Sequence, residues 1–248
     1  MTYAVLLQSA YGPFLVNRND QHQPEALLRT GLPHIDPEIR AILQLVDYLG
    51  ADPVALDCGA NVGLIAVPLA QRLAGCGGIV HAFEPQRTTY YMLAGNTAMS
   101  GLLNLGCHRL ALGEVPGEIE LPILDPYRPA DFGMVSLGHQ TDLPSETVPL
   151  ASVDSLGFHR VDLIKIDVER MELALLKGAA ETIARCRPLI WIEIWPDQYG
   201  TVTPWLEAAG YSLFVFDALN FLAIPRDRLE TIPVTLEPFD GRHNPHFG

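Results

Sequence analysis

The sequence predicts an α/β fold in which helices cover both faces of a doubly wound, mostly parallel sheet that closes with an antiparallel C-terminal hairpin. From Pro53 onward, short apolar stretches alternate with segments of helical periodicity, as happens when helices connect parallel strands. Leu189–Trp195 is apolar almost throughout and Val161–Val168 has an apolar centre, which is typical of buried strands. Tyr211–Asp217 and Phe221–Ile224 are separated by a short turn, which predicts the hairpin.

The composition indicates a soluble globular protein with a substantial core. The chain has 248 residues, 48% of them hydrophobic, which suits one large domain or a domain with a short cap. No apolar run reaches the roughly 18 to 20 residues of a membrane span. The N-terminus lacks the basic start and apolar run of a signal peptide. Four cysteines without a CxxC pair suit reduced thiols, so we expect a cytoplasmic protein.

The formal net charge of −13 bears on the partners of the protein. Nucleic acids and anionic membrane surfaces attract proteins rich in Lys and Arg, so we expect neither as a partner. A neutral or cationic small molecule suits this charge better. The oligomeric state stays open, with a homodimer as one alternative.

Composition divides the chain into three parts. Residues 1–50 form an N-terminal cap segment, which is polar and turn-rich at first and then helical. Its helix begins at Asp36-Pro37-Glu38, with the aspartate as the predicted N-cap, and ends at Gly50. Residues 51–224 form the main domain, and residues 225–248 form a Pro-rich, extended tail.

Periodicity and turn residues predict the remaining elements of the main domain. The further predicted strands are Val54–Asp57, Gly78–Phe83, Cys107–Leu112, Gly117–Pro122 and Glu146–Leu150, the last two around a loop at Asp125–Gly138. The predicted helices are Asn61–Ala74, Gln86–Met99, Arg170–Cys186 and Thr203–Ala209. Pro68 lies beyond the first turn of its predicted helix, so we expect a kink there.

The segment Asp57-Cys58-Gly59-Ala60-Asn61-Val62-Gly63 ends the first of these strands and opens the helix after it. Gly59 allows a tight turn and the close approach of a ligand, and Gly63 allows the helix to pack closely on the strand. A dinucleotide-binding turn needs glycine where the pyrophosphate approaches. Asn61 occupies that position and would crowd a phosphate. Its side chain suits S-adenosylmethionine (SAM), which has no phosphate.

An acidic residue follows the second strand of the main domain. Glu84, next to Pro85, stands where folds that bind adenosyl cofactors hold the ribose hydroxyls. A surface glutamate favoured by the dipole of the following helix is the alternative. The turn and this acid together favour a nucleoside cofactor, bound at the carboxyl ends of the strands.

Several motifs resemble, in order and spacing, those of the FkbM-type SAM-dependent methyltransferases. They are Asp57–Gly63 (DCGANVG), Ala82–Pro85 (AFEP), Lys165–Glu172 (KIDVERME), Leu176–Ala179 (LKGA) and Pro188–Ile194 (PLIWIEI). Two shorter pieces, Asp131–Leu137 and Leu150–Leu156, are similar to the insertion between the third and fourth strands of that family. The resemblance spans about residues 50–215 and implies a class I, Rossmann-like methyltransferase fold.

The resemblance also implies that SAM is the cofactor and that a methyl group is transferred, most often to a hydroxyl of a sugar or a polyketide. Matched by position, the residues that hold the methionine part of SAM are Asp57, Gly59, Ala60 and Asn61, in a turn closed by Gly63. Matched in the same way, Glu84 beside Pro85 holds the ribose, Ala111 lies near the adenine and Asp167 lies beside the sulfonium.

One position departs from the family pattern. Where the family has glycine after Asp-Val-Glu, this chain has Arg170. Glycine there leaves room for a substrate or permits unusual backbone angles. Arg170 therefore narrows the pocket, binds an anionic group of the substrate, or marks a protein that has lost catalysis. The sequence leaves these three interpretations open.

Methyl transfer to a hydroxyl needs positioning and a base for the hydroxyl proton. Asp167, Glu169 and Glu193 are the candidate catalytic residues, because each lies at the end of a predicted buried strand. A buried carboxylate is costly unless it is paired or functional, so Glu193 is alternatively a structural acid, for example one paired with Lys165. Asp167 and Glu169 alternatively cap the turn and the next helix. The carboxylate spacing does not support a metal, and we predict none.

Phe132 and His139 lie in the predicted insertion loop and, with Arg170, are the candidate substrate-binding residues. For His139 the alternative is an ordinary loop histidine. Two other functions stay open besides a small-molecule methyltransferase. One is a non-catalytic module that keeps the fold, with Arg170 filling the site. The other is an NAD(P)-type oxidoreductase, against which Asn61 and the lack of a Tyr-x-x-x-Lys constellation argue.

Overall fold

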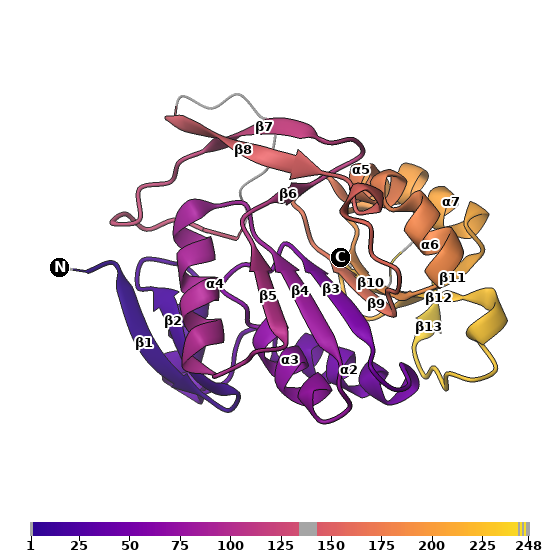
Figure 1. Cartoon of the computed structure of the whole chain (residues 1–248), viewed down its shortest axis with the longest axis horizontal. Coiled ribbons are helices and arrows are strands. Elements are labelled where there is room, and N and C mark those ends of the chain that lie inside the picture. The colour runs from indigo at the N-terminus through magenta and orange to yellow at the C-terminus, as the bar shows by residue number, and fades with distance from the viewer. Residues whose placement is uncertain (1, 134–142, 243, 245, 247–248) are drawn as a thin grey trace.

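The computed structural model describes the chain apart from residues 1, 134–142, 243, 245 and 247–248, and an eight-stranded sheet is its central feature within that part (Figure 1). The strand order is β13-β11-β12-β10-β9-β3-β4-β5. The parallel strands are β3 (Val54–Cys58), β4 (Ile79–Phe83), β5 (Leu105–His108), β9 (Leu163–Ile166) and β10 (Leu189–Glu193). At one edge, antiparallel pairs join β10, β12 (Asn220–Pro225), β11 (Tyr211–Val215) and β13 (Glu237–Pro238). The predicted parallel sheet with a closing hairpin is confirmed.

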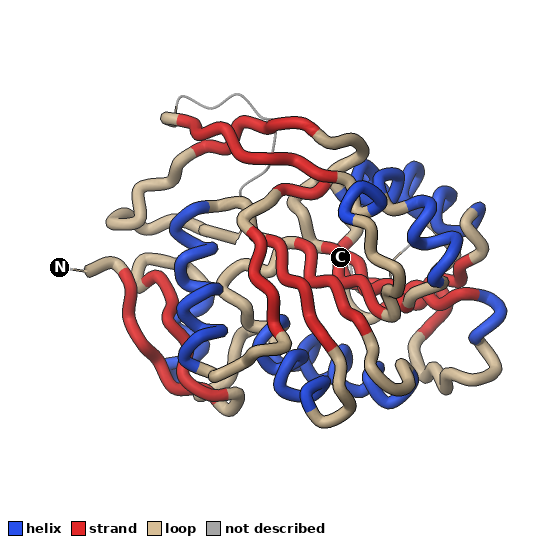
Figure 2. Tube along the Cα trace, in the orientation of Figure 1, coloured by secondary structure: helices blue, strands red, loops and turns tan. Residues whose placement is uncertain are grey.

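Helices cover both faces of this sheet (Figure 2). Successive side chains of a strand face opposite sides, so neighbouring residues enter different apolar layers. Ala55 packs in the layer of α2 (Asp36–Leu45), α3 (Ala66–Ala74) and α4 (Arg87–Met99). Leu56 packs in the layer of α5 (Glu172–Gly178), α6 (Ala180–Cys186) and α7 (Tyr199–Ala208). In the part of the chain that the structure describes, no helix has the length and apolar character needed to cross a bilayer.

The order of the strands creates a crevice between β3 and β9. After β3 the chain proceeds through β4 and β5 toward one edge, whereas β9 and β10 lie on the other side of β3. Connections that leave the carboxyl ends of β3 and β9 therefore diverge, which is where open α/β sheets bind ligands. The N–H of Asp167 donates to the carbonyl of Cys58 at 3.0 Å, so the two strand ends are joined directly.

The first 35 residues contain elements that the sequence analysis did not predict. β1 (Ala4–Ser9) and β2 (Gly12–Asn17) form an antiparallel hairpin, and α1 (Gln23–Thr30) follows it. The hairpin lies beside α4 in Figure 1, and Asn96 of α4 joins them. Its buried side chain accepts from the Leu15 N–H and donates to the carbonyls of Leu15 and Val62. The N-terminal segment is therefore bonded both to α4 and to the turn after β3.

Two predictions about helix starts are wrong. The helix after β3 begins at Ala66 rather than Asn61, so Pro68 falls in its first turn, where a missing N–H costs nothing and no kink is needed. Asp36 is the first residue of α2 and not its N-cap. Its carboxylate instead accepts from the Tyr11 hydroxyl at 2.7 Å and pairs with Arg40 at 2.7 Å.

Two predicted elements are each divided. The predicted strand Cys107–Leu112 is split between β5 and β6 (Ala111–Leu112), and β6 belongs to a separate sheet of order β6-β8-β7 with β7 (Gly117–Pro122) and β8 (Ser145–Ala151). The predicted helix Arg170–Cys186 becomes α5 and α6, which meet at Ala179, a residue with φ −111° outside the helical range. The remaining short helices are η1 (Val46–Tyr48), η2 (Asp154–Leu156), η3 (Pro196–Gln198) and η4 (Arg226–Arg228).

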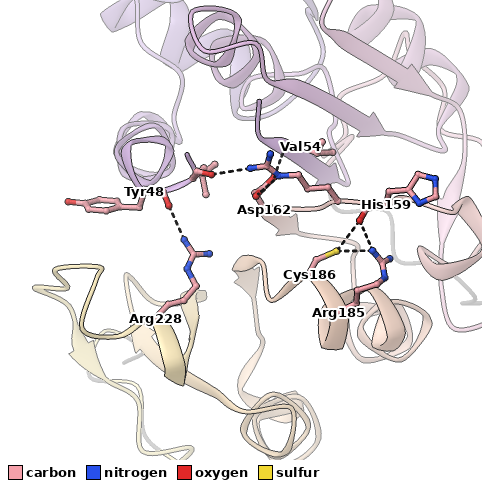
Figure 3. Close-up of polar contacts among 9 residues, drawn as sticks. Tyr48, Val54, His159, Asp162, Arg185, Cys186 and Arg228 are labelled. Atoms are coloured by element: carbon pink, nitrogen blue, oxygen red, sulfur yellow. Dashed lines mark hydrogen bonds and ion pairs between the residues drawn. The ribbon is translucent and has the colours of Figure 1, made fainter. Parts of the chain in front are cut away.

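Polar contacts join distant segments at the amino ends of the strands (Figure 3). Arg228 from the C-terminal segment donates to the Tyr48 carbonyl at 2.9 Å, and the Asp162 carboxylate accepts the N–H of Val54 at 2.8 Å. Arg185 of α6 donates to the His159 carbonyl at 2.6 Å. The first of these contacts joins the two terminal segments to each other, and the other two tie the segment before β9 to β3 and to α6. The division at residues 1–50, 51–224 and 225–248 stays a prediction.

Candidate active site

A cavity of about 360 Å³ opens at the carboxyl ends of β3, β4, β9 and β10. Nine of the residues singled out from the sequence line it: Gly59, Asn61, Glu84, Pro85, Ala111, Phe132, Asp167, Glu169 and Glu193. They come from six separate stretches of the chain, and the fold brings them to one place. His139 lies outside the described residues.

The turn after β3 forms the floor of this cavity. Gly59 has φ +81°, and a Cβ there would lie 1.7 Å from the carbonyl oxygen of Asp167, so no larger residue fits. Gly63 has φ +90°, and a Cβ would lie 2.8 Å from a side chain of α4. The N–H groups of Gly59 and Ala60 both donate to the Phe83 carbonyl, at 3.0 and 2.9 Å. Ala60 and Gly63 therefore shape the turn without lining the cavity.

Glu84 joins the end of β4 to the same turn. Its carboxylate accepts the N–H of Asn61 at 3.0 Å and the N–H of Gln86 at 2.8 Å. Burial raises the pKa of Glu84 to about 7, although these two hydrogen bonds act to lower it. Asn61 has φ +50°, a conformation that asparagine adopts more readily than most residues. Glu84 thus holds the turn in shape and also lines the cavity.

A buried ion cluster lies beneath the turn. Asp57 has no exposed surface and is absent from the described cavity wall. The Lys165 ammonium lies 3.7 Å from Asp57 Oδ1 and 3.1 Å from Asp167 Oδ2, and it donates to the Gly59 carbonyl at 3.2 Å. Burial acts to lower the pKa of Lys165, but the charges of Asp167, Asp57 and Glu38 outweigh it and hold the pKa above its ordinary value. Lys165 therefore pairs with Asp57 and Asp167 and not with Glu193.

Two carboxyl groups with raised pKa values lie at the ends of β9 and β10. Burial, together with the charge of Asp167, raises the pKa of both Glu169 and Glu193 to about 8. The indole N–H of Trp195 donates to Glu193 at 3.0 Å. Among the described residues that line the cavity there is no Lys or Arg, so the wall is acidic. Such a wall favours a cationic ligand. Among the described residues, no group of three or more His, Cys, Asp or Glu side chains is arranged to hold a metal ion.

Arg170 lies outside the described cavity wall. Its guanidinium contacts both carboxylate oxygens of Asp197, at 2.7 and 2.5 Å, and lies 4.7 Å from the ring centroid of Trp195. Its φ of +78° is a left-handed angle that glycine adopts most easily. The left-handed backbone angle therefore explains why the family has glycine at this position. This geometry does not support the interpretations in which Arg170 narrows the pocket or meets a substrate anion.

The sequence analysis missed the wall that comes from the N-terminal segment and from neighbouring loops. These residues are Asp20, His22, Gln23, His34, Ile35, Glu38, Gln86, Asp131 and Asn220. His22 lies 3.1 Å from an oxygen of Asp131, which links the N-terminal segment to the loop that carries Phe132. The helix start at Asp36-Pro37-Glu38 is visible in the sequence, but it indicates a helix terminus and not a ligand site.

Known proteins resemble the chain in both sequence and fold. The FkbM methyltransferase domain matches residues 57–213. Methyltransferase sdnD of Sordaria araneosa is 26% identical over 218 residues, which cover 75% of this chain and 79% of that protein. Methyltransferase FkbM of Methylobacillus flagellatus has a crystal structure with a TM-score of 0.52 and 18% identity, and the match covers 70% of this chain but only 43% of that one.

The matched domain has consequences for the interpretations left open by the sequence. It extends from the end of β3 into β11 and so contains Gly59, Glu84, Asp167, Glu169 and Glu193. An NAD(P)-type oxidoreductase does not agree with this match. The fold, the turn with its acidic partner and the length of the match lead to one conclusion: the chain belongs to the FkbM family of SAM-dependent methyltransferases.

Proposed function

We propose that this protein methylates a hydroxyl group of a small molecule, such as a sugar, a polyketide or another natural-product intermediate. The observation that carries the proposal is the pair of carboxyl groups with raised pKa values, Glu169 and Glu193, on the wall that also holds Gly59 and Glu84. A hydroxyl nucleophile needs a base, and these carboxyls are available for that task.

The residues of the cavity fit SAM. The side-chain oxygen of Asn61 is buried without a hydrogen-bond partner among the described residues, so the turn offers an unused acceptor. Gly59 lines the cavity and presents only backbone atoms to a ligand. Glu84 is positioned to receive ribose hydroxyls, and Ala111 lines the side where the adenine would lie. The acidic wall suits a ligand that carries a sulfonium and an ammonium group.

SAM, when bound, supplies a methyl group activated by a positively charged sulfur. Glu169 or Glu193, as the carboxylate, would take the proton of the acceptor hydroxyl, so that its oxygen could receive the methyl group. A pKa of about 8 makes these carboxylates stronger bases than ordinary glutamates, and a useful fraction is ionised near neutral pH. Trp195 orients Glu193 through its indole N–H.

The acidic wall also restricts the acceptor. Asp20, Glu38 and Asp131 line the side of the cavity that comes from the N-terminal segment and the adjacent loop, and Phe132 adds an apolar surface. Phosphorylated or carboxylated acceptors would be repelled there. Neutral or amine-bearing alcohols are therefore the favoured class of acceptor.

A paired substrate panel tests the proposal. Neutral sugars and polyketide alcohols, each matched with the analogue that lacks the hydroxyl, are incubated with the protein and SAM labelled in its methyl group. We expect label on hydroxyl-bearing compounds only, with one equivalent of S-adenosylhomocysteine released per methyl group transferred. Label on amines but on no alcohol, or no label on any compound, would contradict the proposal.

A further inference from the structure

Glu38, in the first turn of α2, is a buried carboxyl group on the cavity wall that has no partner in the part of the chain that the structure describes. It is 8% exposed and lines the cavity, yet no hydrogen bond or ion pair joins its carboxylate to another described residue. Burying a carboxylate without a partner is costly, so such a group indicates a ligand that is still to be bound. Burial raises the pKa of Glu38 to about 7, although the charge of Lys165 acts to lower it.

The position of Glu38 relative to the strands identifies which part of a ligand it faces. Glu38 shares the cavity wall with Gly59, which follows β3, and with Asp167, which follows β9, and the charge of Asp167 acts on its carboxyl group. Glu84 lies at the end of β4, and Ala111 follows β5, on the other side of β3. An adenosine held from Glu84 to Ala111 therefore leaves the methionine part of SAM over β3 and β9, beside Glu38.

The ammonium group of that methionine part needs an acceptor, and a carboxylate makes the stronger, charge-assisted hydrogen bond. Oδ2 of Asp167 already accepts from Lys165 at 3.1 Å. Asp57 has no exposed surface, and Asn61 offers an uncharged amide oxygen. Glu38 lines the cavity with a carboxyl group that pairs with none of the described residues.

We propose that Glu38 accepts the ammonium group of the methionine part of SAM in a charge-assisted hydrogen bond. The inference rests on SAM as the cofactor of the proposed reaction and names the residue that recognises its amino acid end. It also gives the N-terminal segment a direct role in cofactor binding, through the first turn of α2.

Titration calorimetry with two ligands tests this role. S-adenosylhomocysteine carries the ammonium but no sulfonium charge, so the carboxylates near the methyl group do not affect the comparison. Methylthioadenosine keeps the adenosine and the sulfur but lacks the amino acid part. We expect Glu38→Gln to weaken binding of S-adenosylhomocysteine by about 10- to 100-fold, as for a hydrogen bond to a charged group. Binding of methylthioadenosine should change by less than about twofold.

Glu25→Gln is the matched control, because it makes the same substitution on the surface of α1, where Glu25 forms an ion pair with Arg29. It should leave both affinities unchanged. An equal loss for both ligands in Glu38→Gln would overturn the proposal, since it would show a packing role. Unchanged binding of S-adenosylhomocysteine would also overturn it, while leaving the methyltransferase assignment intact. A wild-type protein that bound neither ligand would overturn the cofactor assignment as well.

A second variant keeps the test decisive if Glu38→Gln does not fold. Glu38→Asp retains the charge but withdraws it by one methylene group. We expect Glu38→Asp to weaken the binding of S-adenosylhomocysteine more than the binding of methylthioadenosine. The loss should be smaller than the loss caused by Glu38→Gln. Equal effects on the two ligands would again overturn the proposal.

Discussion

At the scale of single residues, unusual backbone angles concentrate at the cavity. Asn61, Glu169 and Arg170 have φ of +50°, +50° and +78°, which costs an ordinary residue roughly 1 to 2 kcal/mol. Asn61 is held by Glu84 through its N–H, and Arg170 is held by Glu172, which accepts its N–H at 3.1 Å. Residues around the strand ends therefore offset the strain and keep the turns in place.

The catalytic assignment of the two glutamates makes a prediction about rate and pH. At least one of Glu169→Gln and Glu193→Gln should lower kcat by about 100-fold or more, because glutamine cannot accept the proton. Since the active form is the carboxylate and its pKa is raised to about 8, wild-type kcat/KM should rise with pH up to about 8 and then level off. Steady-state kinetics on a hydroxyl acceptor measure both effects. Full activity in both variants would exclude these residues as the base.

The variant Arg170→Gly tests whether Arg170 obstructs the active site or only occupies a strained backbone position. The substitution relieves the left-handed angle but loses the partly exposed pair with Asp197, which is worth about 0 to 1 kcal/mol. We expect the free energy of unfolding to change by less than about 1 kcal/mol, and SAM affinity and kcat to change by less than about threefold. Urea unfolding and kinetics measure these values. A large gain in activity would instead show that Arg170 obstructs the site.

At the scale of elements, the N-terminal hairpin and α2 complete a site whose floor comes from the central sheet. Asn96 bonds β2 to α4 and to the turn after β3 through one amide group. α2 carries Glu38 to the cavity and packs with α3 on the same face of the sheet. The cap segment is therefore part of the wall and not only a cover.

Asn96→Ala tests how strongly these elements depend on one another. The substitution leaves the Leu15 N–H and the Leu15 and Val62 carbonyls without their partner, so we expect a loss of about 3 kcal/mol in the free energy of unfolding. Met99→Ala, on the exposed side of the same helix, should change it by less than about 0.5 kcal/mol. Urea unfolding of both variants measures the difference. Similar values for the two would contradict the bridging role of Asn96.

At the scale of the whole molecule, the cavity collects buried acids in a protein whose net charge is already −13. Glu38 and Glu84 have pKa values raised to about 7, and Glu169 and Glu193 to about 8, in each case chiefly by burial. In the unfolded chain these groups ionise near 4.5. The folded protein therefore binds more protons than the unfolded chain between these values, and its stability falls as pH rises.

The pH dependence of unfolding measures this effect. Burial lowers the pKa of His34, His81 and His108, which opposes the carboxyl effect below about pH 6.5, so the test belongs between about pH 6.5 and 8. In that window we expect the unfolding temperature of the ligand-free protein to fall with rising pH. Glu193→Gln should make the fall shallower because one titrating group is gone. A stability that rises across the window would contradict the raised pKa values.

The sequence by itself determined the alternation of strands and helices from β3 onward, the turn at Gly59, its acidic partner Glu84 and the family. These features follow from local rules: apolar periodicity marks elements, and left-handed or crowded positions require glycine. The sequence did not predict that one helix begins shortly before Pro68 or that another divides at Ala179, because periodicity does not show where a helix begins or divides.

Only the tertiary structure decided which side chains face the cavity. In the folded protein Asp57 is buried against Lys165, and Arg170 pairs with Asp197. Glu38 of the N-terminal segment lies on the cavity wall. Each of these placements depends on packing between residues far apart in the chain, which periodicity and motif spacing do not encode. The turn that binds the cofactor can therefore be predicted from the sequence. The side chains that face this turn depend on how distant segments pack together.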